Sequence, residues 1–173
     1  MAVPDELGEH IRQRFDYRCA YCGVHERDVG SELEVEHFHP RSKGGSDDID
    51  NLIYSCSACN RFKANYWPTA DAPHHLHLLH PLHDDHQTHV DLLDDGRLTG
   101  LTKRGRFHIE ILHLNRPQLV ILRLRRIQQK QLQQQLQQLY LSQISYQERI
   151  KQLEAEVMHL QVEIMRLRWS SSD

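Results

Sequence analysis

Four cysteines in two pairs have the spacing that most clearly indicates chemistry. Cys19 and Cys22 form one Cys-x2-Cys pair, and Cys56 and Cys59 form the second pair after 33 intervening residues. Two residues between the sulfurs let both sulfurs turn toward one point, and four thiolates fill a tetrahedral, structural zinc site. Two disulfides are the alternative. Because the N-terminal residues do not resemble a signal peptide, we expect a cytoplasmic location, where zinc is favoured over disulfides.

A second group of polar residues lies beside and between the cysteine pairs. Glu36 and His37 are adjacent, Asn51 follows a Gly-Gly turn, and Asn60 comes directly after the last cysteine. A lone Glu-His pair is usually a surface feature. Its combination with two asparagines and a Cys-x2-Cys-Asn run makes coincidence a poor explanation.

These residues belong to the stretch EHFHPRSKGGSDDIDNLIYSCSACNRFK, which follows RCAYC in the chain. Together they resemble the HNH endonucleases, in the subgroup with a four-cysteine zinc site. The resemblance is close over roughly residues 15–66 and looser as far as Arg126. The third motif position is Asn60 in place of histidine, a recognised variation in the family. The resemblance implies a ββα-metal fold and hydrolysis of phosphodiester bonds in DNA.

The resemblance also implies a role for each motif residue. His37 is the general base for water, and Glu36 and Asn60 hold a catalytic Mg²⁺ or Mn²⁺ ion. Asn51 orients the loop next to His37 through backbone hydrogen bonds. Adjacent strand residues point to opposite faces, so the strand must twist or end near Pro40 for Glu36 and His37 to share one site.

Four more residues are candidates for contacts at this site: His39, Arg41, Lys43 and Lys63. Arg41 and Lys43 are expected to touch phosphates beside the scissile bond, with a solvated loop as the alternative. Lys63 follows Asn60 by three residues and is expected to face the nucleic-acid backbone. His39 is either at the edge of the site or a structural histidine.

Seven histidines lie between residues 74 and 89. Their irregular spacing favours solvated or locally hydrogen-bonded side chains over a second metal site. Residues 97–130 include nine basic residues, from Arg97 to Lys130, and one acid, Glu110. This local excess of positive charge can attract phosphate although the whole chain has a net charge of −3. A solvated face is the alternative.

The elements that must position these residues follow from local patterns. A short helix over residues 5–15 carries Leu7, Ile11 and Phe15 on one face. Strands are expected over residues 31–38 and 50–54, and a helix is expected over residues 56–66, which begin with the second cysteine pair. A hairpin around Asp95-Gly96 is expected over residues 90–101, and a further helix over residues 105–114.

The last third of the chain predicts one long helix. Residues 118–169 contain neither Gly nor Pro, and Asn115 with Pro117 signals the helix start. Apolar residues then repeat in a 4,3 spacing from Leu132 to Leu167, with Gln143 in the series. Placing Ile150, Val157 and Ile164 at heptad position a puts leucines at d, and the flanking charged pairs Arg149–Glu154 and Glu163–Arg168 attract in a parallel dimer. We expect a homodimer through residues 132–168; one amphipathic helix packed on its own domain is the alternative.

The chain of 173 residues has 39% hydrophobic and 26% charged residues and no apolar run long enough to span a membrane. The predicted class is α+β, with an HNH module over residues 1–68, a hairpin and helix extension over 69–116, and a coiled-coil helix over 117–169. The predicted function is a metal-dependent, homodimeric DNA endonuclease. The alternatives are a non-catalytic zinc-stabilised DNA-binding scaffold, and a nuclease subunit of a defence or mobile-element system controlled by an unknown protein partner.

Overall fold

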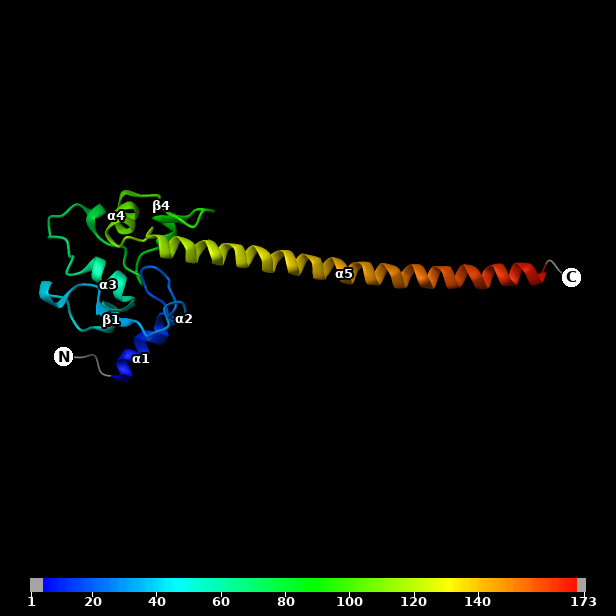
Figure 1. The fold of residues 1–173 in the computed structure, drawn as a ribbon, viewed down its shortest axis with the longest axis horizontal. Helices are drawn as coiled ribbons and strands as arrows, with labels where there is room; N and C mark the ends of the chain where they lie inside the picture. The colour runs from blue at the N-terminus through cyan, green and yellow to red at the C-terminus, as the bar shows by residue number, and fades with distance from the viewer. Residues whose placement is uncertain (1–4, 171–173) are drawn as a thin grey trace. The chain divides into compact units, whose positions relative to one another are not determined.

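The structure is a computed structural model that describes residues 5–170, with side chains for residues 6–167. The chain divides after Arg125 into two compact units. The helices and strands follow in the order α1 (Asp5–Arg14), α2 (Glu26–Val29), β1 (Glu34–His37), β2 (Leu52–Ser55), α3 (Ser57–Lys63), β3 (Val90–Leu92), β4 (Leu98–Gly100), α4 (Lys103–Ile111) and α5 (Pro117–Ser170) (Figure 1). This mixed α+β composition with a long C-terminal helix confirms the predicted fold class.

Strands β1 and β2 form an antiparallel pair, and α3 follows β2 at once. Glu36 is paired with Ile53 and His37 with Leu52. All four residues of β2 are buried, whereas in β1 Glu34 is exposed, Glu36 is buried, and Val35 and His37 are partly buried. The order strand, loop, strand, helix is therefore the predicted ββα arrangement.

Several predicted boundaries were too wide. Strand β1 covers four residues in place of the eight predicted, and the stretch before β2 is a 3₁₀ turn at Ile49–Asn51. Helix α3 stops at Lys63 because Ala64 has φ 47°, which an α-helix cannot accommodate. Tertiary contacts end these short elements where propensity alone would continue them.

Helix α1 covers the buried strand β2 with its apolar face. Ile11 is fully buried against Leu52 and Tyr54, with Leu7 and Phe15 packed at the edge of this cluster. The predicted amphipathic face of the first helix is confirmed. Arg12 and Glu26 add a paired guanidinium–carboxylate contact, with both bonds at 2.7 Å, that connects α1 to α2.

The predicted hairpin forms as β3 and β4, and its turn glycine also makes a close contact. Gly96 has φ 80°, and a Cβ on it would lie 2.6 Å from the carbonyl oxygen of Val120 in α5. The buried Arg123 side chain donates to the Gly96 carbonyl at 3.1 Å. The first turns of α5 therefore belong to the same unit as the hairpin.

The expected helix-start role of Asn115 is not its observed role. Its side chain instead accepts from the Leu98 amide at 2.7 Å and donates to the Leu98 carbonyl at 2.8 Å. Pro117 does occupy the first position of α5, as predicted. The backbone amide and carbonyl of Leu98 in β4 bind both ends of the Asn115 side-chain amide. This side chain is therefore not available to cap α5.

Part of the predicted basic patch is used inside the protein. The guanidinium of Arg104 binds both oxygens of Asp84, at 2.8 and 2.7 Å, and Arg123 is buried on backbone carbonyls. These side chains bind internal acceptors, so the surface excess of positive charge is smaller than a count of residues indicates. Among the described helices, none has the length and hydropathy needed to cross a bilayer.

The histidine-rich segment packs onto α4 through Leu78, Leu79 and His108. Leu79 is fully buried, and its backbone amide donates to His108 Nδ1 at 3.1 Å. Only one group of described metal-binding side chains is close enough to hold an ion, and it contains no histidine. Within the segment, His80 Nδ1 accepts from the Leu82 amide at 3.2 Å, which is a local hydrogen bond of the predicted kind.

The burial of His108 predicts acid sensitivity. Burial, assisted by the nearby His86, Arg104 and His89 and opposed by Asp84, lowers the pKa of His108 to about 3. Between that pH and the ordinary histidine pKa of about 6.5, the unfolded chain binds a proton that the folded chain excludes. The free energy of unfolding should therefore fall as the pH falls from about 6.5 toward 3.

His108→Asn keeps an acceptor for the Leu79 amide and removes the titration. We expect urea unfolding between pH 7 and pH 4 to show a loss of stability about 3 kcal/mol smaller in this variant than in the wild type. His75→Asn, at an exposed position, should behave as the wild type. Parallel pH profiles for all three proteins would contradict the prediction, because losses from other groups cancel in the difference.

Candidate zinc and nuclease sites

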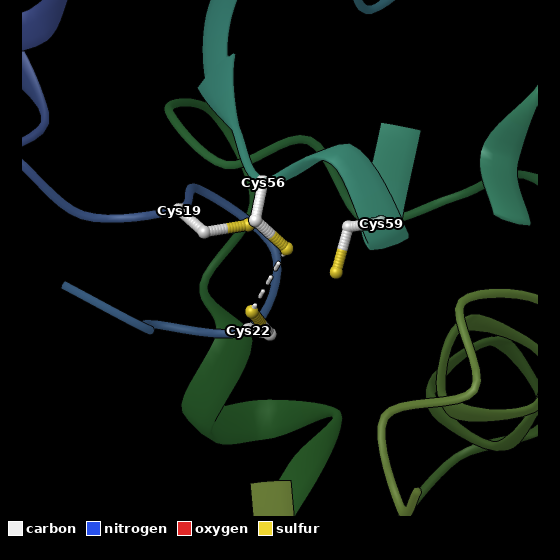
Figure 2. A group of neighbouring side chains, drawn as sticks. All are labelled: Cys19, Cys22, Cys56 and Cys59. Carbon is white, nitrogen blue, oxygen red and sulfur yellow. Dashed lines mark hydrogen bonds between the residues drawn. The ribbon is translucent and has the colours of Figure 1, made fainter. Parts of the chain in front are cut away.

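The four cysteines come together where the turn at residues 19–22, between α1 and α2, meets the start of α3. Figure 2 shows that the side chains of Cys19, Cys22, Cys56 and Cys59 converge on one point. Their sulfur atoms all lie within 4.8 Å of one another, and all four thiols are free of disulfides. The disulfide alternative is therefore wrong for this structure.

Local backbone geometry explains this convergence. The Gly23 amide donates to the Cys19 carbonyl at 2.8 Å, and Gly23 adopts φ 69°, so the first pair lies in a tight turn. The second pair spans the first turn of α3, where the Asn60 amide donates to the Cys56 carbonyl at 2.9 Å. In addition, the Ala20 amide donates to the Tyr54 carbonyl at 2.8 Å, which joins the first turn to β2.

The cluster fits a structural zinc ion. Tetrahedral zinc with Zn–S bonds of about 2.3 Å separates its sulfurs by about 3.8 Å. Cys22 Sγ and Cys56 Sγ are 3.8 Å apart. Four protein ligands leave no open coordination position, so the site stabilises the fold and carries out no reaction.

Arg116 lies against this cluster from a distant part of the sequence. Its Nη2 atom is 3.4 Å from Cys59 Sγ, 3.7 Å from Cys56 Sγ and 3.8 Å from Cys22 Sγ. Its Nη1 atom also donates to the Leu112 carbonyl at 3.3 Å, at the end of α4. Four thiolates on Zn²⁺ carry a net charge of −2, which a guanidinium partly neutralises. No local pattern predicts this contact, because Arg116 lies 57 to 94 positions after these cysteines in the chain.

Arg116→Gln should therefore weaken the retention of zinc. We expect the zinc-loaded protein to release the metal to a colorimetric chelator about tenfold faster than the wild type, because the thiolates lose a hydrogen-bonded cation. Arg61→Gln, at an exposed position on α3, is the matched control. If the two variants release zinc at the same rate, Arg116 has no role in holding the metal.

A separate polar pocket of about 250 Å³ lies between the end of β1 and α3. Glu36, His37 and Asn60 all line it, together with Arg41 and Lys63. Strand β1 ends at His37, as the sequence required if adjacent side chains were to reach one site. The structure thus brings together the three residues predicted for catalysis and cation binding.

Glu36 and Lys63 form a buried pair in this pocket. Lys63 is 2% exposed, and its Nζ atom donates to Glu36 Oε2 at 3.2 Å and to the His37 carbonyl at 2.8 Å. Burial raises the pKa of the Glu36 carboxyl, while the Lys63 charge opposes that shift. The ammonium of Lys63, expected to face the nucleic-acid backbone, is thus bonded inside the protein, and its contact with substrate stays a prediction.

The residues present fit a divalent cation. Glu36 Oε1 is buried and makes no hydrogen bond of ordinary geometry within the described part of the chain, but the Ser55 and Tyr21 hydroxyls lie near enough to favour the ionised Glu36 carboxyl and lower its pKa. A buried carboxylate oxygen in this condition can accept from a neighbouring hydroxyl or a water molecule, or bind a cation. The amide of Asn60 adds a second oxygen at the same pocket. Carboxylate and amide oxygens are donors that suit Mg²⁺ or Mn²⁺.

Asp47 is a site residue that the sequence analysis missed. Its Oδ1 atom accepts from His37 Nε2 at 2.7 Å and from Arg41 Nε at 2.5 Å. The hydrogen bond from Arg41, with that from His37, holds the pKa of the Asp47 carboxyl below its usual range. A carboxylate that orients a catalytic histidine is a common arrangement, and the Asp-Asp pair after the Gly-Gly turn was the available signal.

Asn51 closes the loop between β1 and β2. Its Oδ1 atom accepts from the His39 amide at 2.7 Å, and its Nδ2 atom donates to the carbonyls of His39 and Ser46, at 3.0 and 2.7 Å. Gly45 is needed beside these bonds, because a Cβ there would lie 1.8 Å from the His39 carbonyl oxygen. These are backbone hydrogen bonds of the kind predicted for Asn51.

His39 and Lys43 do not line the pocket that contains Glu36. The His39 ring stacks on Trp67 with a centroid distance of 3.8 Å, and its Nε2 atom is 2.9 Å from the Lys43 carbonyl. Lys43 is exposed on the 3₁₀ turn Arg41–Lys43. Packing on Trp67 gives His39 a structural contact, which was one of its two expected roles.

The fold and the two sites define a small ββα domain with a four-cysteine cluster and a polar, histidine-containing pocket. Residues 19–65 match the family model described as HNH endonuclease. This stretch is therefore an HNH domain of the kind with a zinc-binding cysteine cluster. No curated protein matches the chain.

Proposed function

We propose that this protein is a metal-dependent endonuclease that hydrolyses phosphodiester bonds in DNA. The observation that carries the proposal is the shared pocket of Glu36, His37 and Asn60 inside the stretch that matches the HNH family. Binding DNA as a passive scaffold would need none of these three side chains. Their convergence therefore favours catalysis over the scaffold alternative.

In this proposal His37 is the general base. The Asp47 carboxylate accepts a hydrogen bond, so the proton on the His37 ring lies on Nε2, and Nδ1 is the basic nitrogen. Nδ1 takes a proton from water as the water oxygen bonds to phosphorus. The bond from phosphorus to the 3′ oxygen breaks, and that oxygen takes a proton from solvent. The products have 5′-phosphate and 3′-hydroxyl ends.

Glu36 and Asn60 would hold the Mg²⁺ or Mn²⁺ ion. Bound there, the cation supplies positive charge for the phosphate and the leaving oxygen. Lys63 keeps the Glu36 carboxylate and the His37 carbonyl in place from the buried side. Arg41, on the same pocket and half-exposed, is placed to contact a phosphate next to the scissile bond, and Lys43 extends this basic edge.

His37→Ala should abolish the activity that this pocket supports. We expect nicking of supercoiled plasmid in Mg²⁺ or Mn²⁺ to be slower than in the wild type by about 10²-fold or more, because the water loses its base. Both proteins should keep the same zinc content and unfolding temperature.

The control is His75→Ala, which changes an exposed histidine outside the HNH domain. Equal nicking by the wild type and His37→Ala would remove His37 as the base. DNA binding by a wild type that never cleaves would instead support the scaffold alternative, or a subunit that needs a partner protein.

The exposed apolar stripe of α5 supports a homodimer. Within the second unit, large apolar side chains along the predicted seam are between 42% and 71% exposed: Leu132, Leu136, Leu139, Tyr146, Ile150, Leu153, Val157, Leu160, Ile164 and Leu167. Ile150, Leu153, Glu154 and Val157 surround a shallow depression, which is the set of a, d, e and a positions that receives a side chain from a partner helix. The partner of Glu163, Arg168, has its side chain outside the described residues.

A second copy of the chain fits this stripe because Arg149 and Glu154 have complementary charges at g and e of a parallel pair. Leu153→Glu should place a charge in the seam and convert the dimer to a monomer in light scattering. Gln152→Glu makes the same charge change beside it, at position c, and should stay dimeric. A chain shortened to end at Arg126 should also be monomeric. If the shortened chain remains a dimer, α5 is not the dimer interface.

A further inference from the structure

Glu34 contacts Asn60, a residue of the predicted cation site, from a neighbouring pocket. The side chain of Asn60 lines both the 250 Å³ pocket that contains Glu36 and a neighbouring pocket of about 480 Å³ that contains Glu34. Asn60 Nδ2 donates to Glu34 Oε2 at 2.8 Å. The asparagine amide therefore forms part of the wall between the two pockets, with Glu34 on one side and Glu36 on the other.

The spacing of the residues explains this arrangement. Glu34 and Glu36 are two residues apart in β1 and share one face of the strand, while Asn60 and Lys63 are three apart in α3 and share one face of the helix. Each glutamate consequently has its own partner. Glu36 binds the ammonium of Lys63, and Glu34 binds the amide of Asn60.

The chemistry of the pair fixes the orientation of the asparagine amide. An ionised carboxylate only accepts hydrogen bonds, so the end of the amide that faces Glu34 must be the NH₂ group. The two ends of a planar amide point in different directions, and Oδ1 is therefore the end turned away from Glu34. This conclusion does not depend on how the oxygen and nitrogen atoms of the amide were distinguished.

We propose that Glu34 is a positioning residue, which holds the amide oxygen of Asn60 toward the divalent cation site. This inference rests on the proposed function. An asparagine without this acceptor is free to rotate its amide and present NH₂, a hydrogen-bond donor that cannot ligate a cation. Glu34 itself lines the neighbouring pocket and would act on the cation only through Asn60.

The test measures Mn²⁺ binding to the zinc-loaded, full-length protein by electron paramagnetic resonance of the free ion. Glu34→Ala should raise the Mn²⁺ dissociation constant about tenfold, the effect typical of losing a group that orients a metal ligand. Glu34→Gln keeps an oxygen that accepts from the amide and should retain most of the affinity. Zinc content and unfolding temperature should not change.

The matched control is Glu32→Ala. Glu32 is also acidic and lies two residues before Glu34, but its side chain is 72% exposed and pairs with Arg12 at 3.1 Å. This control removes the same charge without removing the acceptor for Asn60. Its Mn²⁺ affinity should equal that of the wild type, and an equal loss in both variants would reduce the role of Glu34 to general attraction of cations.

A second background separates orientation from attraction. In Asn60→Asp either oxygen can ligate the ion, so orientation no longer matters, and Glu34 becomes a repelling neighbour. Adding Glu34→Ala to this background should leave Mn²⁺ binding unchanged or make it tighter. Weakening of the same size in both backgrounds would overturn the proposal.

The failure of this inference is distinguishable from the failure of the proposed function. If the wild type binds Mn²⁺ and Glu34→Ala binds it equally well, only the role of Glu34 is lost. If the wild type binds no Mn²⁺, both the cation site and the role of Glu34 are overturned. Any plasmid nicking by such a protein would require another mechanism.

Discussion

The convergence of four sulfurs is the constraint on which the HNH domain depends. A stretch of about 50 residues buries too little apolar surface to be stable without a cross-link or a metal. The cysteine cluster connects the turn at residues 19–22 to the start of α3 and so fixes α3 relative to β2. Because Asn60 and Lys63 lie on α3, the same metal site also determines where they meet the residues of β1.

The pocket between β1 and α3 is built from charges that would be costly if left alone. Burying Lys63 without Glu36, or Glu36 without Lys63, would leave an unpaired charge in the interior, a loss of several kcal/mol. Lys63 binds one oxygen of Glu36, and the Ser55 and Tyr21 hydroxyls are the nearby groups that favour the ionised carboxyl. The pocket thus places a buried, lysine-paired carboxylate next to a histidine, and the proposed cation would have to bind beside the charges of Lys63 and Arg41.

Much of the HNH domain could be predicted from the sequence because its signals are local. The spacing of the cysteines, the Gly-Gly turn and the apolar face of Leu7, Ile11 and Phe15 each depend on residues close together in the chain. The catalytic roles of Glu36, His37 and Asn60 were inferred by resemblance, and the structure adds their shared pocket. The long helix could also be predicted, because residues 118–169 contain neither Gly nor Pro, and α5 covers 54 residues in the structure.

The contacts that escaped prediction join residues far apart in the chain. Arg116 reaches sulfurs of cysteines up to 94 positions away, and Asn115 pairs with Leu98 in place of capping α5. Asp47 lies only ten residues from His37, but nothing in a run of two aspartates says which one bonds to the His37 ring. A count of basic residues likewise could not show that Arg104 and Arg123 are bonded to internal acceptors.

The position of Arg116 just before Pro117 has a mechanical consequence. The same guanidinium contacts the thiolates and the last carbonyls of α4, at the point where the long helix begins. Oxidation of the four cysteines to two disulfides, with release of the zinc ion, would remove the anionic charge that this half-buried cation neutralises, and its desolvation would then be uncompensated. Because Arg116 lies directly before the first residue of α5, loss of its contact with the thiolates would weaken the packing of the first turn of this helix.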